Sequence, residues 1–340
     1  MANVLSELNP TLMDVARRLD PSGNDIADIV EIMSQQNPVL QDMVMKECNS
    51  RMVNKTVIRT GLPAGTWRKL YGGVQPEKST TKQIQDSCGM LETYSEIDKA
   101  LADMAPNKAR FLLSESVAFL EGMNQTMAST LFYGDVSAYP ERFEGLAPRY
   151  SAYGADKEKS SFNVVNGGGT GSANTSAWLV VWGTNTVHGI YPSGSKAGLS
   201  HEDLGQVTAQ DSDGGMYEVY RTHYKWDLGL TLRDWRYVVR IANIDTMQLS
   251  KAGSSEYAGP DLTSLLITAS HKIPNLGMGR AAIYCNRTLA TALDILALTK
   301  QSLALKIDEV NGKPMTNFRG IPIRECDAIL DTEAAVSEDN

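Results

Sequence analysis

The chain contains few residues whose types and spacing could perform chemistry. Histidine occurs at only four positions, namely His188, His201, His223 and His271. The sequence has neither the His-Glu-x-x-His pattern of zinc hydrolases nor the Gly-x-Ser-x-Gly motif of acyl-transferring serine enzymes. His223 alternates with apolar residues in a predicted strand, so we interpret it as part of a solvated polar face and not as a ligand.

The four cysteines are spread along the chain at Cys48, Cys88, Cys285 and Cys326. No two of them form a Cys-x-x-Cys pair, so the spacing favours neither a zinc site nor a disulfide framework. We expect reduced and mostly buried thiols.

Two further segments resemble ligand loops only superficially. The glycine-rich run 166–172 is not followed by the Gly-Lys-Ser/Thr of a phosphate-binding loop. Asp211 and Asp213 begin like a calcium loop, but the twelfth position is Thr222 where a glutamate is needed, so we expect a turn. The sequence therefore predicts no catalytic, metal-binding or cofactor-binding residue, and we expect neither an enzyme nor a cofactor.

Composition indicates an ordinary globular protein of one large or two moderate domains. The 340 residues are 42% hydrophobic and 21% charged, with a formal net charge of −8. The net acidity argues against a dedicated nucleic-acid binder, although it permits a protein that merely tolerates DNA nearby. The sequence shows no signal peptide and no apolar run long enough to cross a bilayer. We expect a soluble protein, made in a cytoplasm, that does not contact a membrane.

Residues 51–82 differ from this average. Their seven basic residues are opposed by Glu77 alone, which leaves a surplus of six positive charges. Glycine and proline recur between residues 61 and 76 and favour turns and extended chain. We predict a hairpin with arms at 57–60 and 66–71, and a solvated surface loop is the alternative.

Such a hairpin has too little apolar surface to be stable alone, so we expect it to lie on an acidic neighbour. The residues that we predict at this subunit interface are Arg59, Trp67, Arg68, Lys69, Lys78 and Lys82.

Residues 106–134 carry the clearest helical pattern, with Pro106 suited to the start and Gly134 to the end. At ~1.5 Å per residue this helix would be roughly 40 Å long. Apolar residues recur at helical spacing and predict one buried face, which Phe119 and Met123 widen: Leu113, Val117, Leu120, Met127 and Leu131.

Residues 220–232 alternate strictly between apolar and polar, which predicts one long strand with one buried face. The alternation changes phase after Asp234, so a bulge or turn is expected there. Buried strands are also predicted at 177–182 and 187–191. The last third has the pattern of an α/β unit, with helices from 262 and 287, strands at 281–285, 305–307 and 321–323, and a frayed acidic end.

Several strings, in this order along the chain, resemble the major capsid proteins of tailed, podovirus-type bacteriophages. They are Gly65–Leu70 with Gly73–Pro76 and Ser79–Thr81, then Phe119–Asn124, Phe143–Leu146, Arg240–Ile244 and Phe318–Ile323. The resemblance implies an α+β, Hong Kong 97-type fold with an N-terminal arm, an extended β-hairpin loop, a long spine helix, long peripheral strands and an axial α/β domain.

Under this resemblance the chain divides into five parts. Residues 1–50 would be the arm, with a short amphipathic helix near residues 25–33, and 51–95 the extended loop. The spine helix would occupy 96–150, the long peripheral strands with their loop insertions 151–250, and the axial domain 251–340.

The resemblance also implies partners. Pentamers and hexamers of the chain would tile an icosahedral shell around double-stranded DNA, with which contact would be non-specific. No long N-terminal helical scaffolding segment precedes the arm, so either a separate scaffolding protein or none is expected to guide assembly. A portal and a cementing protein are the other expected partners. The protein would assemble in the host cytoplasm and reside in the virion capsid. An encapsulin-like nanocompartment shell and an enzyme with an unrecognised site are the alternatives.

Overall fold

The computed structural model describes residues 35–249, 259–299, 305–310 and 313–339, together with Pro10 and Lys251. The helix expected near residues 25–33 lies outside this part of the chain. The described residues form two compact units. The first unit comprises Met90–Ala128 and Gly198–Asp227 with Gln35 and Gln36, and the second comprises Asn37–Gly89, Ser129–Ala197 and Leu228 onward.

The first unit combines two helices with parts of three strands. Its elements are the end of β3 (Thr80–Asp98), α3 (Lys99–Met104), most of α4 (Lys108–Tyr133), β8 (Leu199–Gln210) and most of β9 (Met216–Leu232). Strands β8 and β9 form an antiparallel hairpin whose turn contains Asp211 and Asp213, as expected for these residues. A small apolar core joins the helices and strands through Ile97, Leu101, Ala102, Ala105 and Phe111.

Helix α4 confirms the predicted helix within two residues at its start and one at its end. The Asn107 side chain accepts a hydrogen bond from the Arg110 amide at 3.2 Å, which satisfies one free amide of the first turn. The predicted apolar face is only partly right. Met123, Met127 and Leu131 are buried, whereas three predicted residues nearer the start are exposed: Leu113 by 64%, Val117 by 40% and Leu120 by 38%.

In the first half of α4 the buried residues instead lie off the predicted face, and they include Phe111 and Glu115. The predicted residues and the buried residues both recur at helical spacing. The sequence pattern therefore identifies the helix, but it does not decide which side of the helix packs against the rest of the protein. A stripe of exposed apolar residues is the result.

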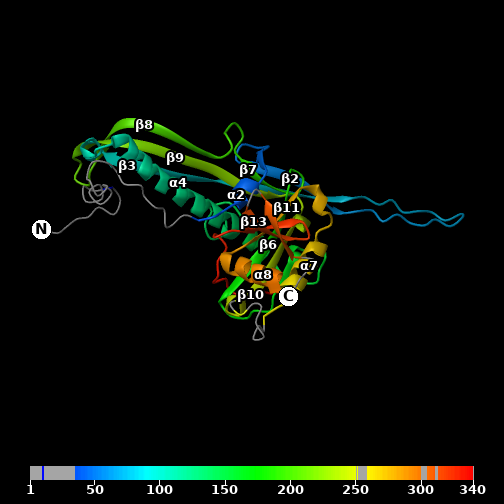
Figure 1. Ribbon diagram of the computed structural model, residues 1–340. Coiled ribbons are helices and arrows are strands. Elements are labelled where there is room, and N and C mark those ends of the chain that lie inside the picture. Colours follow the sequence, from blue (N-terminus) through cyan, green and yellow to red (C-terminus); the bar gives the residue numbers. More distant parts are fainter. Residues whose placement is uncertain are drawn as a thin grey trace. The chain divides into compact units, whose positions relative to one another are not determined.

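The second unit is built around a mixed sheet (Figure 1). Strand β6 (Asn174–Trp182) is buried at every position and lies between β10 (Val238–Asp245) and β11 (Arg280–Cys285), both antiparallel to it. Because β6 is buried on both faces, its residues 177–182 form a continuous apolar run in the sequence. Strand β14 (Ile321–Glu325) continues the sheet parallel to β11, followed by β13 (Lys313–Phe318) and β12 (Leu305–Val310).

Two helices cover this sheet. Helix α7 (Leu262–Lys272) packs against β10, and α8 (Arg287–Thr299) packs against β12 and β14. The side chain of Asn286 accepts a hydrogen bond from the Leu289 amide at 2.9 Å, which confirms the predicted cap. The α/β pattern predicted for the last third is therefore confirmed, with β13 as an unpredicted addition.

The remaining elements are short or lie at the edge of the sheet. They are α2 (Val39–Asp42), β1 (Met45–Glu47), β2 (Val53–Gly61), α5 (Leu146–Arg149), β4 (Ala152–Tyr153), η1 (Ser160–Asn163), β5 (Val164–Asn166), β7 (Val187–Tyr191), η2 (Trp235–Tyr237), α6 (Thr246–Leu249), η3 (Leu276–Met278) and β15 (Ser337–Glu338). The phase change predicted after Asp234 is confirmed as a turn, because η2 separates β9 from β10.

The C-terminal segment was predicted to be frayed, and this prediction is wrong. Strand β15 pairs in parallel with β4, and the carboxylate of Asp339 accepts hydrogen bonds from Lys159 at 3.1 Å and Ser161 at 2.9 Å. Acidic composition suggested solvent exposure, but backbone pairing and specific partners hold this segment in place.

A buried ion pair ties the C-terminal segment to the sheet. Arg240 on β10 contacts Glu333 at 2.9 Å, and their side chains are only 6% and 5% exposed. Glu333 also accepts hydrogen bonds from Tyr133 at 2.5 Å and from Ser176. Burial and the charge of Glu333 raise the pKa of Tyr133 well above its usual range, so the phenol remains a donor. All four cysteines are buried and none forms a disulfide, which agrees with the prediction of reduced thiols.

Candidate assembly surface

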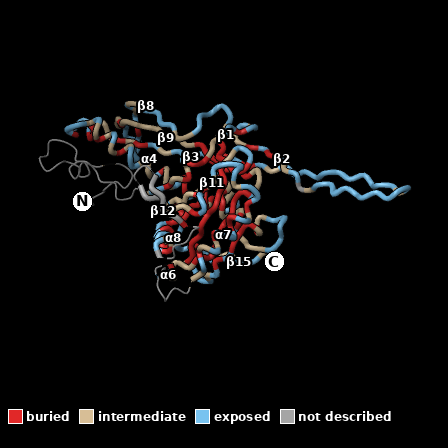
Figure 2. The backbone as a smooth tube through the Cα atoms, turned by 45° about the vertical axis from the view of Figure 1, so that its right-hand side comes forward, coloured by how far each residue is buried: buried red, intermediate tan, exposed pale blue. Residues whose placement is uncertain are grey.

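The basic hairpin predicted for residues 51–82 is present, but its arms differ from the prediction. Strand β2 pairs antiparallel with the start of β3, from Val53 opposite Ser87 to Gly61 opposite Thr80. Residues 66–71 belong to the connecting loop 62–79, which has no ladder pairing. Glycine and proline interrupt that stretch, whereas the polar run after residue 80 carries the second arm. The hairpin is exposed along its outer part (Figure 2).

The structure brings all six predicted interface residues onto this one hairpin. Arg59 lies on β2 and Lys82 on β3, while the loop holds the other four: Trp67, Arg68, Lys69 and Lys78. All six are exposed, and Trp67 has an exposed fraction of 102%, so its side chain is fully open to solvent.

The six do not share one face. Arg59 is opposite Thr81, and Lys82 is opposite Ile58 in the next cross-strand pair. Successive residues of a strand point to opposite faces, so Arg59 and Lys82 lie on opposite sides of the hairpin. Lys82 lines a cavity of about 480 Å³ at the root of the hairpin, together with residues that include Glu158 and Asp339. It is thus the member of the set with acidic groups nearby in its own subunit.

The positive charge of the hairpin is uncompensated within the described residues. None of its basic side chains forms an ion pair with a described residue. The carboxylate of Glu77 instead accepts a hydrogen bond from the Gly65 amide at 3.1 Å and so links the two sides of the loop. The remaining charge of the hairpin is therefore available to solvent ions or to another molecule.

Four apolar residues of the loop were missed as site residues. Leu62, Leu70, Tyr71 and Val74 are exposed by 77%, 84%, 104% and 48%. The sequence could have identified them, because they lie within the basic segment, where no predicted buried face of a helix or strand includes them. Exposed apolar side chains gathered on one segment indicate a surface that another molecule covers.

A second hairpin carries the opposite charge. Residues 197–220, which include β8 and the start of β9, contain five acidic residues and no lysine or arginine. Glu218 accepts hydrogen bonds from Thr208 at 2.7 Å and Gln206 at 3.1 Å, and these bonds lower its pKa. The segment therefore stays negative near neutral pH. A charge count along the sequence would have found it.

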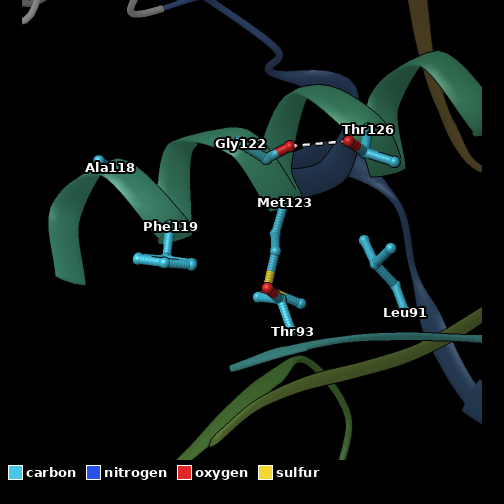
Figure 3. Close-up of a pocket in the computed structure, with 7 residues that line it drawn as sticks. All are labelled: Leu91, Thr93, Ala118, Phe119, Gly122, Met123 and Thr126. Atoms are coloured by element: carbon cyan, nitrogen blue, oxygen red, sulfur yellow. Dashed lines mark hydrogen bonds between the residues drawn. The ribbon is translucent and has the colours of Figure 1, made fainter. Parts of the chain in front are cut away.

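An apolar groove in the first unit offers no site for chemistry. This groove of about 390 Å³ lies in the first unit, between α4 and the end of β3 (Figure 3). Its lining carries no titratable side chain: Leu91, Thr93, Ala118, Phe119, Gly122, Met123 and Thr126. Where the chain is described, no cluster of three metal-binding residues occurs, and no helix is both long and apolar enough to cross a membrane.

The fold and the exposed hairpin together indicate a structural subunit that acts through contacts with other molecules. Comparison with known families and solved structures identifies the class of protein. The family model of the major capsid protein GP7 matches residues 20–337. A chain in the near-atomic structure of bacteriophage Epsilon15 shares 36% sequence identity with a TM-score of 0.78, over 98% of this chain and 99% of that chain. Comparison with curated proteins found no match.

Other solved shells are more remote. The capsid of bacteriophage JBD30 shares 8% identity over 89% of this chain and 95% of its own, with a TM-score of 0.46. The SrpI encapsulin of Synechococcus elongatus PCC 7942 shares 10% identity over 68% and 95%, with a TM-score of 0.44.

The chain belongs to the GP7 family of bacteriophage major capsid proteins. It has the Hong Kong 97-type fold, forms a shell by self-association, and is located in the virion capsid. Its role is structural and not enzymatic, and the encapsulin-like alternative is not favoured.

Proposed function

We propose that the chain forms pentamers and hexamers that tile an icosahedral shell around double-stranded DNA. The observation that carries this proposal is the hairpin, which exposes Trp67 and an unpaired positive charge that one subunit alone leaves unsatisfied. Subunits would be made and assembled in the host cytoplasm. The net charge of −8 fits a shell that holds DNA without binding its sequence.

The five parts of the chain receive roles in this proposal. Residues 1–50 act as an arm, 51–95 as the loop that reaches a neighbour, and 96–150 as the spine. Residues 151–250 supply the long peripheral strands, and 251–340 form the axial domain around which pentamers and hexamers are organised.

The hairpin would make its contact through Arg59, Trp67, Arg68, Lys69, Lys78 and Lys82. The acidic hairpin 197–220 of a neighbouring subunit is its proposed recipient. The basic segment carries a surplus of six positive charges and the acidic segment five negative ones, so the two complement each other. Each exposed ion pair contributes only ~0–1 kcal/mol, but a shell repeats every contact many times. Burial of Trp67 and Tyr71 would add apolar area at ~25 cal/mol per Å².

A separate scaffolding protein, a portal and a cementing protein are further proposed partners. They follow from membership in a family of phage shell proteins, and the cementing protein would require a surface that remains exposed after assembly. Contact with packaged DNA would be non-specific.

Charge reversal of the loop tests the proposal. The double change Arg68→Glu with Lys69→Glu should slow or abolish shell formation, measured by light scattering and electron microscopy, while the circular dichroism of the subunit stays unchanged. The control reverses two exposed lysines outside the hairpin, Lys157→Glu with Lys196→Glu, and should assemble normally. Equal assembly of the two variants would refute the role of the loop.

A further inference from the structure

A small polar cavity lies in the second unit near the root of the basic hairpin. Its volume is about 100 Å³, several times the ~30 Å³ that one water molecule occupies. Residues from β1, β2 and β7 and from the segment after β9 line it, and those that matter here are Lys46, Asn54, Lys55, His188 and Arg233. The lysines are exposed and His188 is buried, so the cavity runs inward from the surface.

The cavity is positively charged without a counter-ion. Lys46, Lys55 and Arg233 line it, and no carboxylate does. Neither lysine forms an ion pair with a described residue, and Arg233 donates to neutral oxygens of Thr184 at 3.2 Å and Asn185 at 3.1 Å.

The carboxylates next to these cations in the sequence have other partners. Glu47 accepts hydrogen bonds from the Ser193 hydroxyl and the Gly194 amide, both at 2.8 Å. Asp234 pairs with Arg236 at 2.7 Å. The three positive charges around the cavity therefore remain unneutralised by these groups.

His188 is the second, independent indication of a ligand. Its exposed fraction is 0%, and neither ring nitrogen has a partner with regular hydrogen-bond geometry in the described part of the chain, although the Gly183 backbone interacts with the ring. Burial, and then the charges of Lys46 and Arg233, lower its pKa to about 4, against a weak opposing interaction with the Gly183 backbone. A buried polar group left without a partner is unfavourable, and a ligand with acceptor atoms would satisfy the ring N–H.

We propose that this cavity binds one small inorganic oxyanion, of the size and charge of phosphate. The cations Lys46, Lys55 and Arg233 supply the attraction, and a ring N–H of His188 donates to the inner oxygen. A polymer phosphate fits less well, because its two ester substituents would have to enter a cavity of about 100 Å³.

A bound anion would connect strands that are distant in the sequence. Lys46 lies on β1, Lys55 on β2, His188 on β7, and Arg233 follows β9. The ion would thereby stabilise the root of the hairpin whose outer part is proposed to contact a neighbour. The inference does not depend on that contact and can be tested on unassembled subunits.

Equilibrium dialysis of the full-length subunit against radiolabelled inorganic phosphate, at constant ionic strength, tests the site. We expect saturable binding of one phosphate per subunit, and at least tenfold weaker binding for Lys46→Gln and for Arg233→Gln. The control Lys157→Gln removes the same charge from an exposed lysine that does not line the cavity, and it should bind like the unchanged protein.

Two further experiments make the result decisive. Dimethyl phosphate should compete poorly, and phosphate should raise the midpoint of thermal unfolding for the unchanged protein but not for Lys46→Gln, which retains its fold because Lys46 is exposed. Non-saturable binding, or equal weakening by Lys157→Gln, would overturn the proposal.

Discussion

Replacing Glu333 by glutamine removes a buried negative charge while keeping the size of the side chain. In the unchanged protein this carboxylate pairs with Arg240 at 2.9 Å, and both side chains are almost fully buried. Arg240 would keep its charge, because a guanidinium does not deprotonate in proteins. Its other partners are neutral: the Ser176 hydroxyl at 3.1 Å and the Tyr150 carbonyl at 2.9 Å.

The size of the effect follows from this burial. Breaking a buried pair so that one charge stays uncompensated costs ~3–5 kcal/mol. The pair of Arg236 with Asp234 is the matched control, since Arg236 is 55% exposed and its contact distance is 2.7 Å. Exposed pairs contribute only ~0–1 kcal/mol, so Asp234→Asn should cost little although its ion pair is shorter.

Urea unfolding of unassembled subunits, followed by circular dichroism, measures the difference. With a slope near 2 kcal/mol per molar urea, Glu333→Gln should lower the unfolding midpoint by roughly 1.5–2.5 M. Asp234→Asn should lower it by less than ~0.5 M. Equal shifts for the two variants would refute the view that burial, and not the contact distance, sets the strength of the pair.

Two further predictions concern the backbone and pH. Gly134→Ala should destabilise the subunit by ~1–3 kcal/mol, because the new Cβ would lie 2.4 Å from the Phe143 carbonyl oxygen. Gly122→Ala in α4 should stabilise it by ~0.5–1 kcal/mol, because the new Cβ meets no atom within 4 Å. Urea unfolding midpoints that move in the same direction for both variants would contradict this prediction. The pKa of His188 is lowered to about 4 in the folded subunit, whereas the same imidazole binds a proton near pH ~6.5 in the unfolded chain. The free energy of unfolding should therefore fall as the pH drops from 6.5 to 4, by roughly 3 kcal/mol in all. In His188→Asn the pH dependence over this window should be weaker by that amount, and an unchanged slope would count against a buried neutral imidazole.

The sequence predicted those elements whose own residues specify them. Helix α4 has helical spacing with suitable ends, and α8 has Asn286 as its cap. Residues 177–182 of strand β6 are uniformly apolar, and the sheet buries both faces of this strand. Local pattern and tertiary environment agree in these three elements, so sequence reasoning succeeds there.

Elements that depend on distant partners were not predictable. Strand β8 and the outer part of β3 are polar and largely exposed, so no alternation marks them. The hairpin arms are fixed by pairing of β2 with β3 across an 18-residue loop, 62–79, and short patterns near the glycines pointed to the wrong second arm. His223 was expected in solvent, but its ring stacks on Tyr94 at 4.4 Å.

The candidate surface was predictable in its charge and not in its geometry. Counting basic residues locates the hairpin, yet only the register shows that Lys82 faces away from Arg59. The cavity around His188 has no sequence signal, because β1, β2 and β7 meet there from separate parts of the chain.

An electron cryo-microscopy reconstruction of the assembled shell tests the central claim most directly, by showing what surrounds the hairpin. The account predicts that Trp67 and Tyr71, both fully exposed in the single subunit, lie within contact distance of a neighbouring subunit, with Arg68 and Lys69 facing its acidic residues. A shell in which loop 62–79 projects freely into solvent would contradict it.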